Sequence, residues 1–294
     1  MNAHEAAAAA LPVELVELRP GRSLAVHRSG PAGDHVVILV HGSCASMLQW
    51  QAQAAHLSSQ GFSVVLYDWL GCGRSPKPRG WGLYGMEELY EDLKAVVRAY
   101  QAKHTTLIGH SAGCGLCLRL AAECEAAGGA PSTTLPRPPS QLVLVAPVIG
   151  GLPAQLRLIF HLPLFILDYI QPSLSAGFKD LALHAETRKA ATPEHEALLS
   201  LVDALQSANP MHMCKAYYRQ YAGIPHTPPP VKAQVLIAVG EADLIAPAAV
   251  HAERLRSLLG CAREVALVPR SGHQCMQEQP AAMNKFLLDF LRSV

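Results

Sequence analysis

A pentapeptide centred on a serine is the first feature of the sequence that points to chemistry. Residues 109–113 read Gly-His-Ser-Ala-Gly, which matches the pattern G-x-S-x-G. A short apolar run precedes Ser111 and a helical pattern begins at Ala112, so the sequence predicts a tight strand-to-helix turn that exposes the Ser111 hydroxyl. The two glycines leave room for that turn. A serine in this position is a candidate nucleophile, provided that a base removes its proton and an acid orients the base.

Asp243 and His273 are the candidates for that acid and base. Each follows an apolar run, Asp243 within Gly-Glu-Ala-Asp and His273 within Ser-Gly-His. The carboxyl ends of strands are where open α/β sheets place their sites, and the order serine, acid, histidine is the order expected with this turn. We therefore predict that Ser111 attacks, that His273 transfers the proton and that Asp243 orients His273. Glu241 is a weaker candidate for the acid and is more typical of a turn residue.

The third requirement is an oxyanion hole, because the tetrahedral intermediate of acyl transfer carries a negative charge. We expect one donor to be the backbone amide of Ala112, at the start of the helix after the nucleophile. The other donor is expected to be the amide of Ser43, within the sequence His-Gly-Ser-Cys that follows the apolar run 35–40. We call residues 41–44 the oxyanion loop. Gly42 in that sequence allows the backbone to approach a substrate.

Short apolar runs alternate with helical patterns over most of the chain, which is typical of a mostly parallel sheet covered by helices. Strands are expected at residues 13–18, 23–28, 35–40, 62–67, 105–109, 141–146, 234–239 and 264–268. Helices are expected at residues 47–59 and 86–101, from 112, near 247–259 and in a last segment that ends at 294. Residues 148–230 carry helical patterns only, which predicts an inserted helical lid. The chain then divides into a first part of the core (1–147), the lid (148–230) and a second part of the core (231–294), with an exposed loop at 127–140.

The composition excludes several classes of protein. The chain has 24 Lys and Arg against 23 Asp and Glu, so no basic excess is present to bind a nucleic acid. Only 16% of the residues are charged, and 50% are hydrophobic, yet no uninterrupted apolar run is long enough to span a membrane. The first residues include no basic segment before the alanine run, so we expect a cytoplasmic protein whose eight cysteines are reduced.

With two further motifs, the chain resembles the α/β-hydrolase family from residue 35 to its C-terminus. These motifs are residues 68–75, Asp-Trp-Leu-Gly-Cys-Gly-Arg-Ser, and Trp50 after the oxyanion loop. The resemblance is to the branch with epoxide hydrolases, C–C hydrolases and abhydrolase-domain lipases and esterases, and it implies a mostly parallel, eight-stranded sheet flanked by helices. Ser111 replaces the nucleophilic aspartate of the epoxide and haloalkane enzymes. In some lipid-acting relatives H-x-x-x-x-D marks acyl transfer, but here Glu278 occupies the last position, so the resemblance does not favour acyl transfer.

These observations favour a serine hydrolase that cleaves an ester of a fairly apolar acyl group and that needs neither a metal nor a cofactor. A C–C bond hydrolase with the same triad is one alternative, and a catalytically silent ligand-binding or scaffolding relative is another. His110 is expected in the pocket wall, and Phe160 and Phe165 of the lid are candidates to bind the substrate. For the lid segment 152–170 as a whole, packing on the core is favoured over lining a pocket, because buried helices are also hydrophobic all round. Peripheral contact with a membrane surface ranks third, since Arg157 is the only cation in the segment. The oligomeric state stays open.

The cysteines of the core are expected to be packing residues. Cys114 and Cys117 form a C-x-x-C spacing, but no second pair completes a zinc site. Cys44 and Cys275 lie beside the oxyanion loop and the candidate base, and packing is favoured for them over regulation through a thiol.

Overall fold

A computed structural model of the chain describes residues 11–128, 134–151, 154–261 and 263–293. Four segments named above therefore include residues outside the described part of the chain. These residues are 1–10 with the alanine run, 129–133 of the expected loop, 152–153 of the expected lid and 294 at the end of the last expected helix. In the part that is described, no helix combines the length and the hydropathy needed to cross a membrane.

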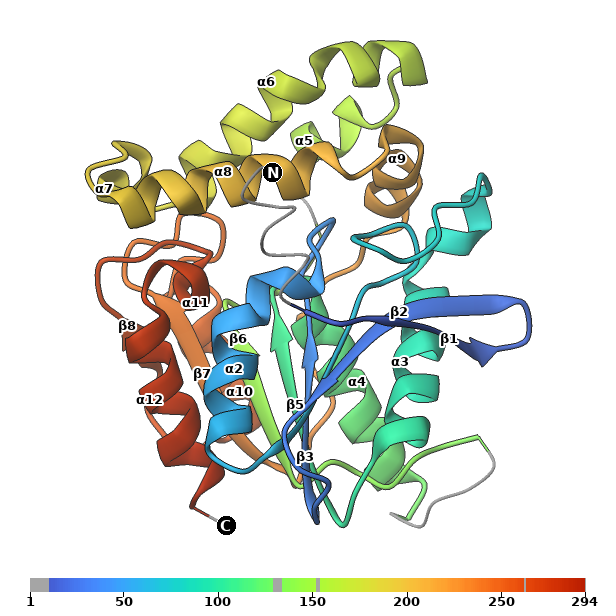
Figure 1. The fold of residues 1–294 in the computed structure, drawn as a ribbon, viewed down its shortest axis with the longest axis vertical. Coiled ribbons are helices and arrows are strands. Elements are labelled where there is room, and N and C mark those ends of the chain that lie inside the picture. The colour runs from blue at the N-terminus through green and yellow to red at the C-terminus, as the bar shows by residue number, and fades with distance from the viewer. Residues whose placement is uncertain (1–10, 129–133, 152–153, 262, 294) are drawn as a thin grey trace.

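Eight strands form a single sheet that runs through the centre of the molecule (Figure 1). The strands are β1 (Glu14–Arg19), β2 (Arg22–Ser29), β3 (His35–Val40), β4 (Ser63–Tyr67), β5 (His104–His110), β6 (Gln141–Val145), β7 (Gln234–Gly240) and β8 (Ala266–Val268). Their order in the sheet is β1-β2-β4-β3-β5-β6-β7-β8. The pairs β1–β2 and β2–β4 are antiparallel, and all the others are parallel. The mostly parallel eight-stranded sheet is thus confirmed.

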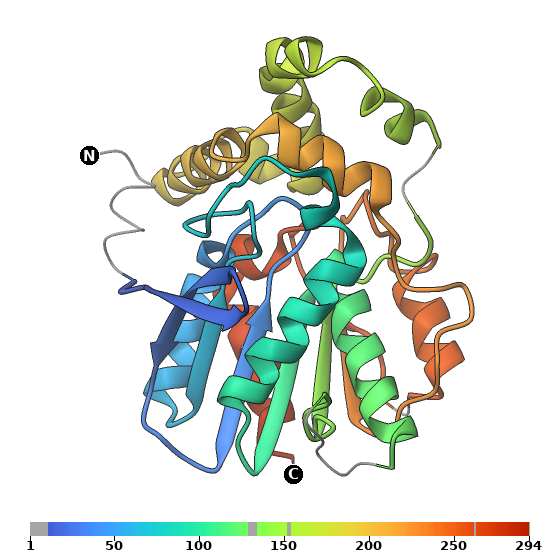
Figure 2. The same ribbon diagram turned by 90° about the vertical axis from the view of Figure 1, so that its right-hand side faces the viewer.

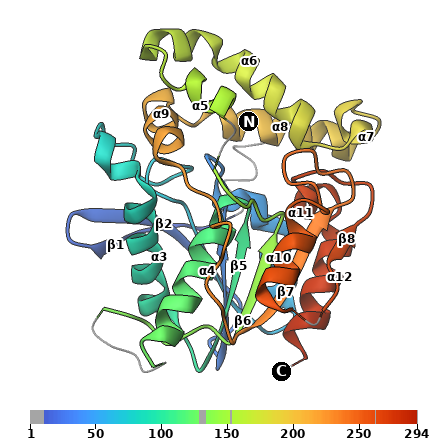
Figure 3. The ribbon, with the colours of Figure 1, turned by 180° about the vertical axis from the view of Figure 1, so that it is seen from behind.

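Helices cover both faces of this sheet, because successive residues of a buried strand point to opposite faces. In β3, Val37 and Leu39 pack in one apolar cluster with Leu57 and Leu287, whereas Ile38 belongs to a second cluster on the opposite face. The first face carries α2 (Gln51–Ser59), α11 (Cys275–Glu278) and α12 (Pro280–Leu291). The second face carries α3 (Met86–Tyr100), α4 (Ala112–Ala126) and α10 (Ala252–Leu259), which are in front in Figure 3.

In the described residues between β6 and β7, five helices lie over the carboxyl ends of the parallel strands (Figures 1 and 2). They are α5 (Ala154–Ile159), α6 (Leu164–Ala182), α7 (Ala185–Arg188), α8 (Pro193–Ser207) and α9 (Met211–Gln220). We call these five helices the helical insertion.

The chain leaves the sheet for the helical insertion and returns from it at one point, which we call the neck. Ile149 and Ile224 pair there in an isolated parallel bridge. The Gly150 amide donates to the Ile224 carbonyl at 2.7 Å, and the Ile224 amide donates to the Val148 carbonyl at 2.9 Å. The neck therefore ties together two segments that are more than seventy residues apart in the sequence.

Most of the expected strands agree with the structure to within one residue at each end, and the last helix, α12, ends at Leu291. Three other elements differ more. The helix expected at 47–59 begins with a 3-10 turn, Met47–Trp50, before α2. The helix expected near 247–259 begins only at Ala252, because the Val250 amide donates to the Pro247 carbonyl and closes a turn in place of the first helical residues. The strand expected at 264–268 is shorter, and β8 begins at Ala266.

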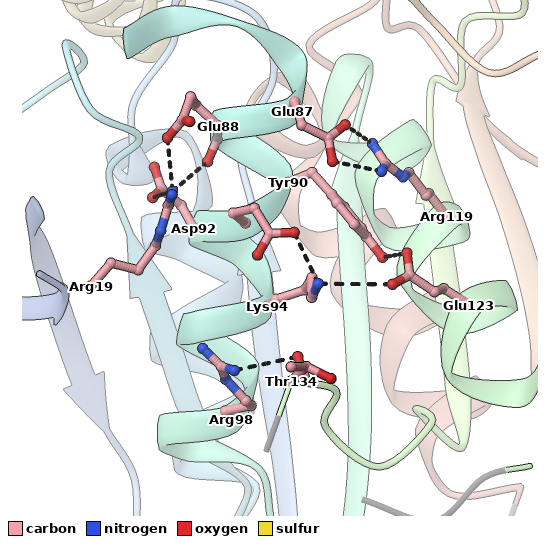
Figure 4. A network of polar contacts seen from close by, with 11 residues as sticks. Arg19, Glu87, Glu88, Tyr90, Asp92, Lys94, Arg98, Arg119, Glu123 and Thr134 are labelled. Carbon is pink, nitrogen blue, oxygen red and sulfur yellow. Dashed lines mark hydrogen bonds and ion pairs between the residues drawn. The ribbon is translucent and has the colours of Figure 1, made fainter. Parts of the chain in front are cut away.

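Helix α3 is fastened to its neighbours by ion pairs (Figure 4). Arg19 of β1 lies 3.0 Å from Glu88 and 2.9 Å from Asp92, and Arg119 of α4 lies 2.7 Å from Glu87. A buried pair continues this network, since Arg22 Nε lies 2.5 Å from Asp92 Oδ1. The first two strands and α4 are thereby held on either side of α3.

Candidate active site

Ser111 lies at the sharp turn between β5 and α4, as the sequence predicts. Its backbone has φ 50° and ψ −116°, which is a strained conformation for a residue with a side chain. A Cβ atom on Gly109 would lie 2.7 Å from the Cys114 nitrogen, and one on Gly113 would lie 2.8 Å from the His41 carbonyl oxygen. Only glycine fits at these two positions, because the contacts are with backbone atoms that cannot move aside.

Asp243 and His273 are in direct contact at the carboxyl edge of the sheet. His273 Nδ1 lies 2.8 Å from Asp243 Oδ2, and both side chains are buried. The other carboxylate oxygen of Asp243 accepts hydrogen bonds from the amides of Ile245 and Ala246, at 2.9 and 2.8 Å. Since the Asp243 carboxylate accepts the hydrogen bond of Nδ1–H, Nε2 of a neutral His273 is left as the proton acceptor.

The charge state of Asp243 follows from opposing effects. Burial alone would raise the pKa of Asp243, but the charge and hydrogen bond of His273 oppose this, together with the two backbone amides. The net result is a pKa below the usual value, so the carboxylate stays ionised at neutral pH. Glu241, the weaker candidate for the acid, instead accepts a hydrogen bond from the exposed Arg270 amide at 3.1 Å.

The oxyanion loop lies directly beside the candidate nucleophile. A Cβ atom on Gly42 would lie 3.3 Å from the Ser111 Cβ and 2.6 Å from His110 Nδ1. Ser43 follows in this loop, and Ala112 is the first residue of α4, where the amides have no partner within the helix. The structure therefore brings both expected donor segments to Ser111.

His110 fills the space between the oxyanion loop and the loop of His273. Its Nε2 lies 3.0 Å from the His273 carbonyl oxygen, and the two imidazole rings are 4.9 Å apart. Burial, with the nearby His273, lowers the pKa of His110 to about 3, so its ring is neutral. Nε2–H must then be the donor to the carbonyl. His110 is 2% exposed, so its place in a pocket wall stays a prediction.

His41 is a site residue whose role the sequence does not reveal. Its Nδ1 donates to the Gly42 carbonyl at 2.8 Å, and its Nε2 accepts from the Trp69 amide at 2.9 Å. Burial lowers the pKa of His41 to about 4, so its ring stays neutral and fixes the oxyanion loop to the segment after β4. The only signal in the sequence is the position of His41 directly before Gly42.

The two phenylalanines expected to bind substrate lie in different surroundings. Phe160 is partly buried and stacks on Tyr218 of α9, with ring centroids 4.5 Å apart. Phe165 is 73% exposed on α6, so the structure does not place it in a walled pocket. Leu167, two residues further along α6, is fully buried in the core cluster. The apolar sequence of α6 thus reflects packing on one side only.

The cysteines near the site are packing residues. Cys44, Cys114 and Cys275 are buried free thiols, and burial raises the pKa of each above its usual value. A thiol with a raised pKa forms little of the reactive thiolate at neutral pH. Cys117 is equally buried on α4, and in the described part of the chain no cluster of His, Cys, Asp or Glu side chains could hold a metal ion.

Glu278 connects the loop of His273 to the helical insertion, which the sequence does not indicate. Its two carboxylate oxygens accept from the amides of Gly272, at 2.6 Å, and His184, at 2.7 Å. We expect Glu278→Gln to lower the free energy of unfolding by about 1–3 kcal/mol, because the new amide group faces a buried N–H that loses its acceptor. Denaturation in urea measures this loss.

The matched control is Glu253→Gln on the surface of α10. Glu253 pairs with Arg256 at 2.8 Å but is half exposed, so its replacement should change the free energy of unfolding by less than about 0.5 kcal/mol. Equal stabilities of the Glu278→Gln and wild-type proteins would show that the carboxylate does not hold the two loops together.

The sheet, the strained serine and the Asp243–His273 pair together define an α/β hydrolase. The profile of the alpha/beta hydrolase family matches residues 37–286, and the chain belongs to that family. It is 27% identical over 268 residues to Protein ABHD8 of Homo sapiens, an alignment that covers 89% of this chain and 56% of that protein. The chain therefore spans little more than half the length of this curated relative.

Solved structures with the same fold include several hydrolases. An enol-lactonase from Burkholderia xenovorans LB400 superposes with a TM-score of 0.75 at 19% identity, covering 96% of this chain and 100% of that one. An esterase from Thermogutta terrifontis gives a TM-score of 0.74 at 18% identity, covering 96% and 98%. At these identities the similarity shows the fold alone.

Proposed function

We propose that this protein is a serine hydrolase that cleaves carboxylic esters of a fairly apolar acyl group through an acyl-enzyme intermediate. The observation that carries the proposal is the buried hydrogen bond of 2.8 Å between His273 and Asp243, at the same edge of the sheet as the strained Ser111. Two of the solved structures with this fold are named as an esterase and an enol-lactonase, and both names denote enzymes that act on ester bonds. These names support the same class of reaction for this chain.

The proposed reaction has two steps. Ser111 Oγ attacks the ester carbonyl while His273 Nε2 takes its proton, and the same proton then passes to the leaving alcohol. Water, activated by His273, cleaves the acyl-enzyme in the second step. Asp243 keeps the Nδ1–H of His273 oriented and stabilises the imidazolium that forms. The amides of Ser43 and Ala112 are the proposed donors to the oxyanion in both steps.

The preference for an apolar acyl group is supported by the walls beside the oxyanion loop. Mostly apolar side chains pack between this loop and α9, among them Cys44, Trp69, Tyr84 and Met213, and the crevice between them is too narrow to hold a water molecule. These side chains offer contacts to methylene groups and few partners to polar ones. An acyl chain that reached this region would exchange water for apolar surroundings.

The test combines labelling with a series of substrates. We expect a fluorophosphonate probe to modify wild-type protein at Ser111, identified by mass spectrometry of the modified peptide. With p-nitrophenyl esters, kcat/KM should rise with acyl length by up to about fourfold per added methylene, which corresponds to full burial of each group. Absence of labelling in folded protein would support the silent alternative, and a flat series would remove the apolar acyl group from the proposal.

A further inference from the structure

The oxyanion loop adopts a conformation that its own sequence does not stabilise. The Ala45 amide donates to the Gly42 carbonyl at 3.3 Å, which closes a turn, and Cys44 at its third position has φ 47°. Turns with a positive φ at this position favour glycine or asparagine, and cysteine adopts it only under strain. Contacts from outside the loop must therefore hold the peptide between Ser43 and Cys44 in place.

Two buried side chains of the segment 209–217 provide these contacts. Asn209, just before α9, donates from Nδ2 to the Cys44 carbonyl. Tyr217 of α9 shares a hydrogen bond of 2.7 Å between its hydroxyl and Ser43 Oγ. These two hydrogen bonds hold adjacent residues of the oxyanion loop, and the side chains that form them lie more than 160 residues further along the sequence.

Helix α9 is itself held firmly against the core. The ring of Tyr217 lies 6.0 Å from that of Trp69, whose amide is the donor to His41. A Cβ atom on Gly71 would lie 2.5 Å from the Met213 side chain, so no space separates α9 from the loop after β4. Helix α9 thus reaches the oxyanion loop directly through Tyr217 and indirectly through Trp69 and His41.

We propose that Tyr217, assisted by Asn209, is a positioning residue that holds the Ser43 amide in its oxyanion-binding orientation. The catalytic part of this inference rests on the proposed function. The two hydrogen bonds from Tyr217 and Asn209 to the oxyanion loop are present in the folded chain whether or not it is an enzyme. Oxyanion donors act through preorganisation, and small errors in their position reduce the rate strongly. Helix α9 is then a fixed part of the catalytic frame, even if other helices of the helical insertion move.

The first arm of the test is a double-mutant cycle on kcat and KM for a short p-nitrophenyl ester. Tyr217→Phe should lower kcat about tenfold and leave KM within about twofold, as expected when one hydrogen bond that orients a transition-state contact is lost. Ser43→Ala should have a similar effect, and the double variant should be no slower than Ser43→Ala alone. If the losses in kcat of the two single variants multiply in the double variant, the inference is overturned. It is also overturned if Tyr217→Phe raises KM and leaves kcat unchanged.

The matched control is Tyr221→Phe. Tyr221 is also buried, directly after α9, but among the described residues it makes no hydrogen bond to the oxyanion loop, so kcat of Tyr221→Phe should equal that of the wild type. A loss equal to that of Tyr217→Phe would point to general loosening of α9 instead of the specific contact with Ser43.

The second arm does not depend on activity. Hydrogen exchange followed by mass spectrometry should show the amides of residues 43–46 exchanging at least about tenfold faster in Tyr217→Phe than in wild type, with β3 unchanged. If the fluorophosphonate does not label wild-type protein but exchange is faster in Tyr217→Phe, the proposed function fails, whereas the role of Tyr217 in holding the oxyanion loop is supported. Unchanged exchange together with an unchanged kcat in a labelled protein would overturn the inference and leave the proposed function intact.

Discussion

Replacing Ser111 by alanine is expected to lower kcat for an activated ester by about 10⁶. The variant lacks the only hydroxyl placed at the turn between β5 and α4, so His273 has no nucleophile to activate. Binding and the oxyanion donors would still leave some acceleration over the reaction in water. The measurement is kcat at saturating p-nitrophenyl ester, with the melting temperature followed in parallel. Retention of more than about one hundredth of the wild-type rate would show that Ser111 is not the nucleophile.

Two carboxylates near the site allow a graded control. Asp243→Asn should lower kcat by about 10⁴, because the asparagine amide no longer fixes the tautomer of His273. Glu241→Gln should leave kcat nearly unchanged, since the Glu241 carboxylate accepts its hydrogen bond from the Arg270 amide at the surface and not from His273. The reverse order of effects would assign the role of the acid to Glu241.

Replacing Asp92 by asparagine is expected to lower the free energy of unfolding by about 3–5 kcal/mol. Asp92 is 1% exposed and receives two hydrogen bonds from Arg22, at 2.5 and 2.7 Å, and one from Arg19 at 2.9 Å. Asparagine fits the same space but leaves the buried Arg22 guanidinium with the more distant and partly exposed Glu88 carboxylate, at 3.9 Å, as its remaining counter-charge. Urea denaturation at neutral pH measures the loss.

An exposed ion pair provides the comparison for this prediction. Asp289 lies 3.7 Å from Lys285 on α12, and both side chains are largely exposed, so Asp289→Asn should change the free energy of unfolding by less than about 0.5 kcal/mol. The double replacement Arg22→Met with Asp92→Leu should restore much of the stability lost in Asp92→Asn, because no charge is then left unpaired. A loss below about 1 kcal/mol in Asp92→Asn would mean that water reaches Arg22 easily.

The sheet and the central residues of the site could be predicted because their signals are local. Continuous apolar runs mark parallel strands buried on both faces, and two glycines beside Ser111 mark a turn that excludes any side chain. Asp243 and His273 could be found because parallel strands end at one edge, so that residues after different strands meet there. That argument needs only the positions of the strands in the sequence and of the residues that directly follow them.

The contacts that hold the site in place could not be predicted. Ser43 and Tyr217 are 174 residues apart, and Glu278 reaches His184 across 94 residues. No periodicity connects such positions, and their hydrogen bonds depend on how the helical insertion settles on the core. Phe165 illustrates the same difficulty. In a largely apolar helix, the sequence does not indicate which apolar residues face the core and which, like Phe165, face the solvent.

The neck has a consequence for how proteins of this fold can diversify. Its two segments pair with each other, and a Cβ atom on Gly223 would collide with the Gly150 carbonyl oxygen at 1.9 Å. Below the neck, β6 and β7 pair in parallel from Gln141 with Gln234 to Val145 with Ala238, so the sheet on this side is held by its own strand pairing. The neck is therefore a suitable crossover point for recombination, at which whole insertions could be exchanged between relatives. A chimaera joined there would inherit its sheet from one parent and the partner of its oxyanion loop from the other.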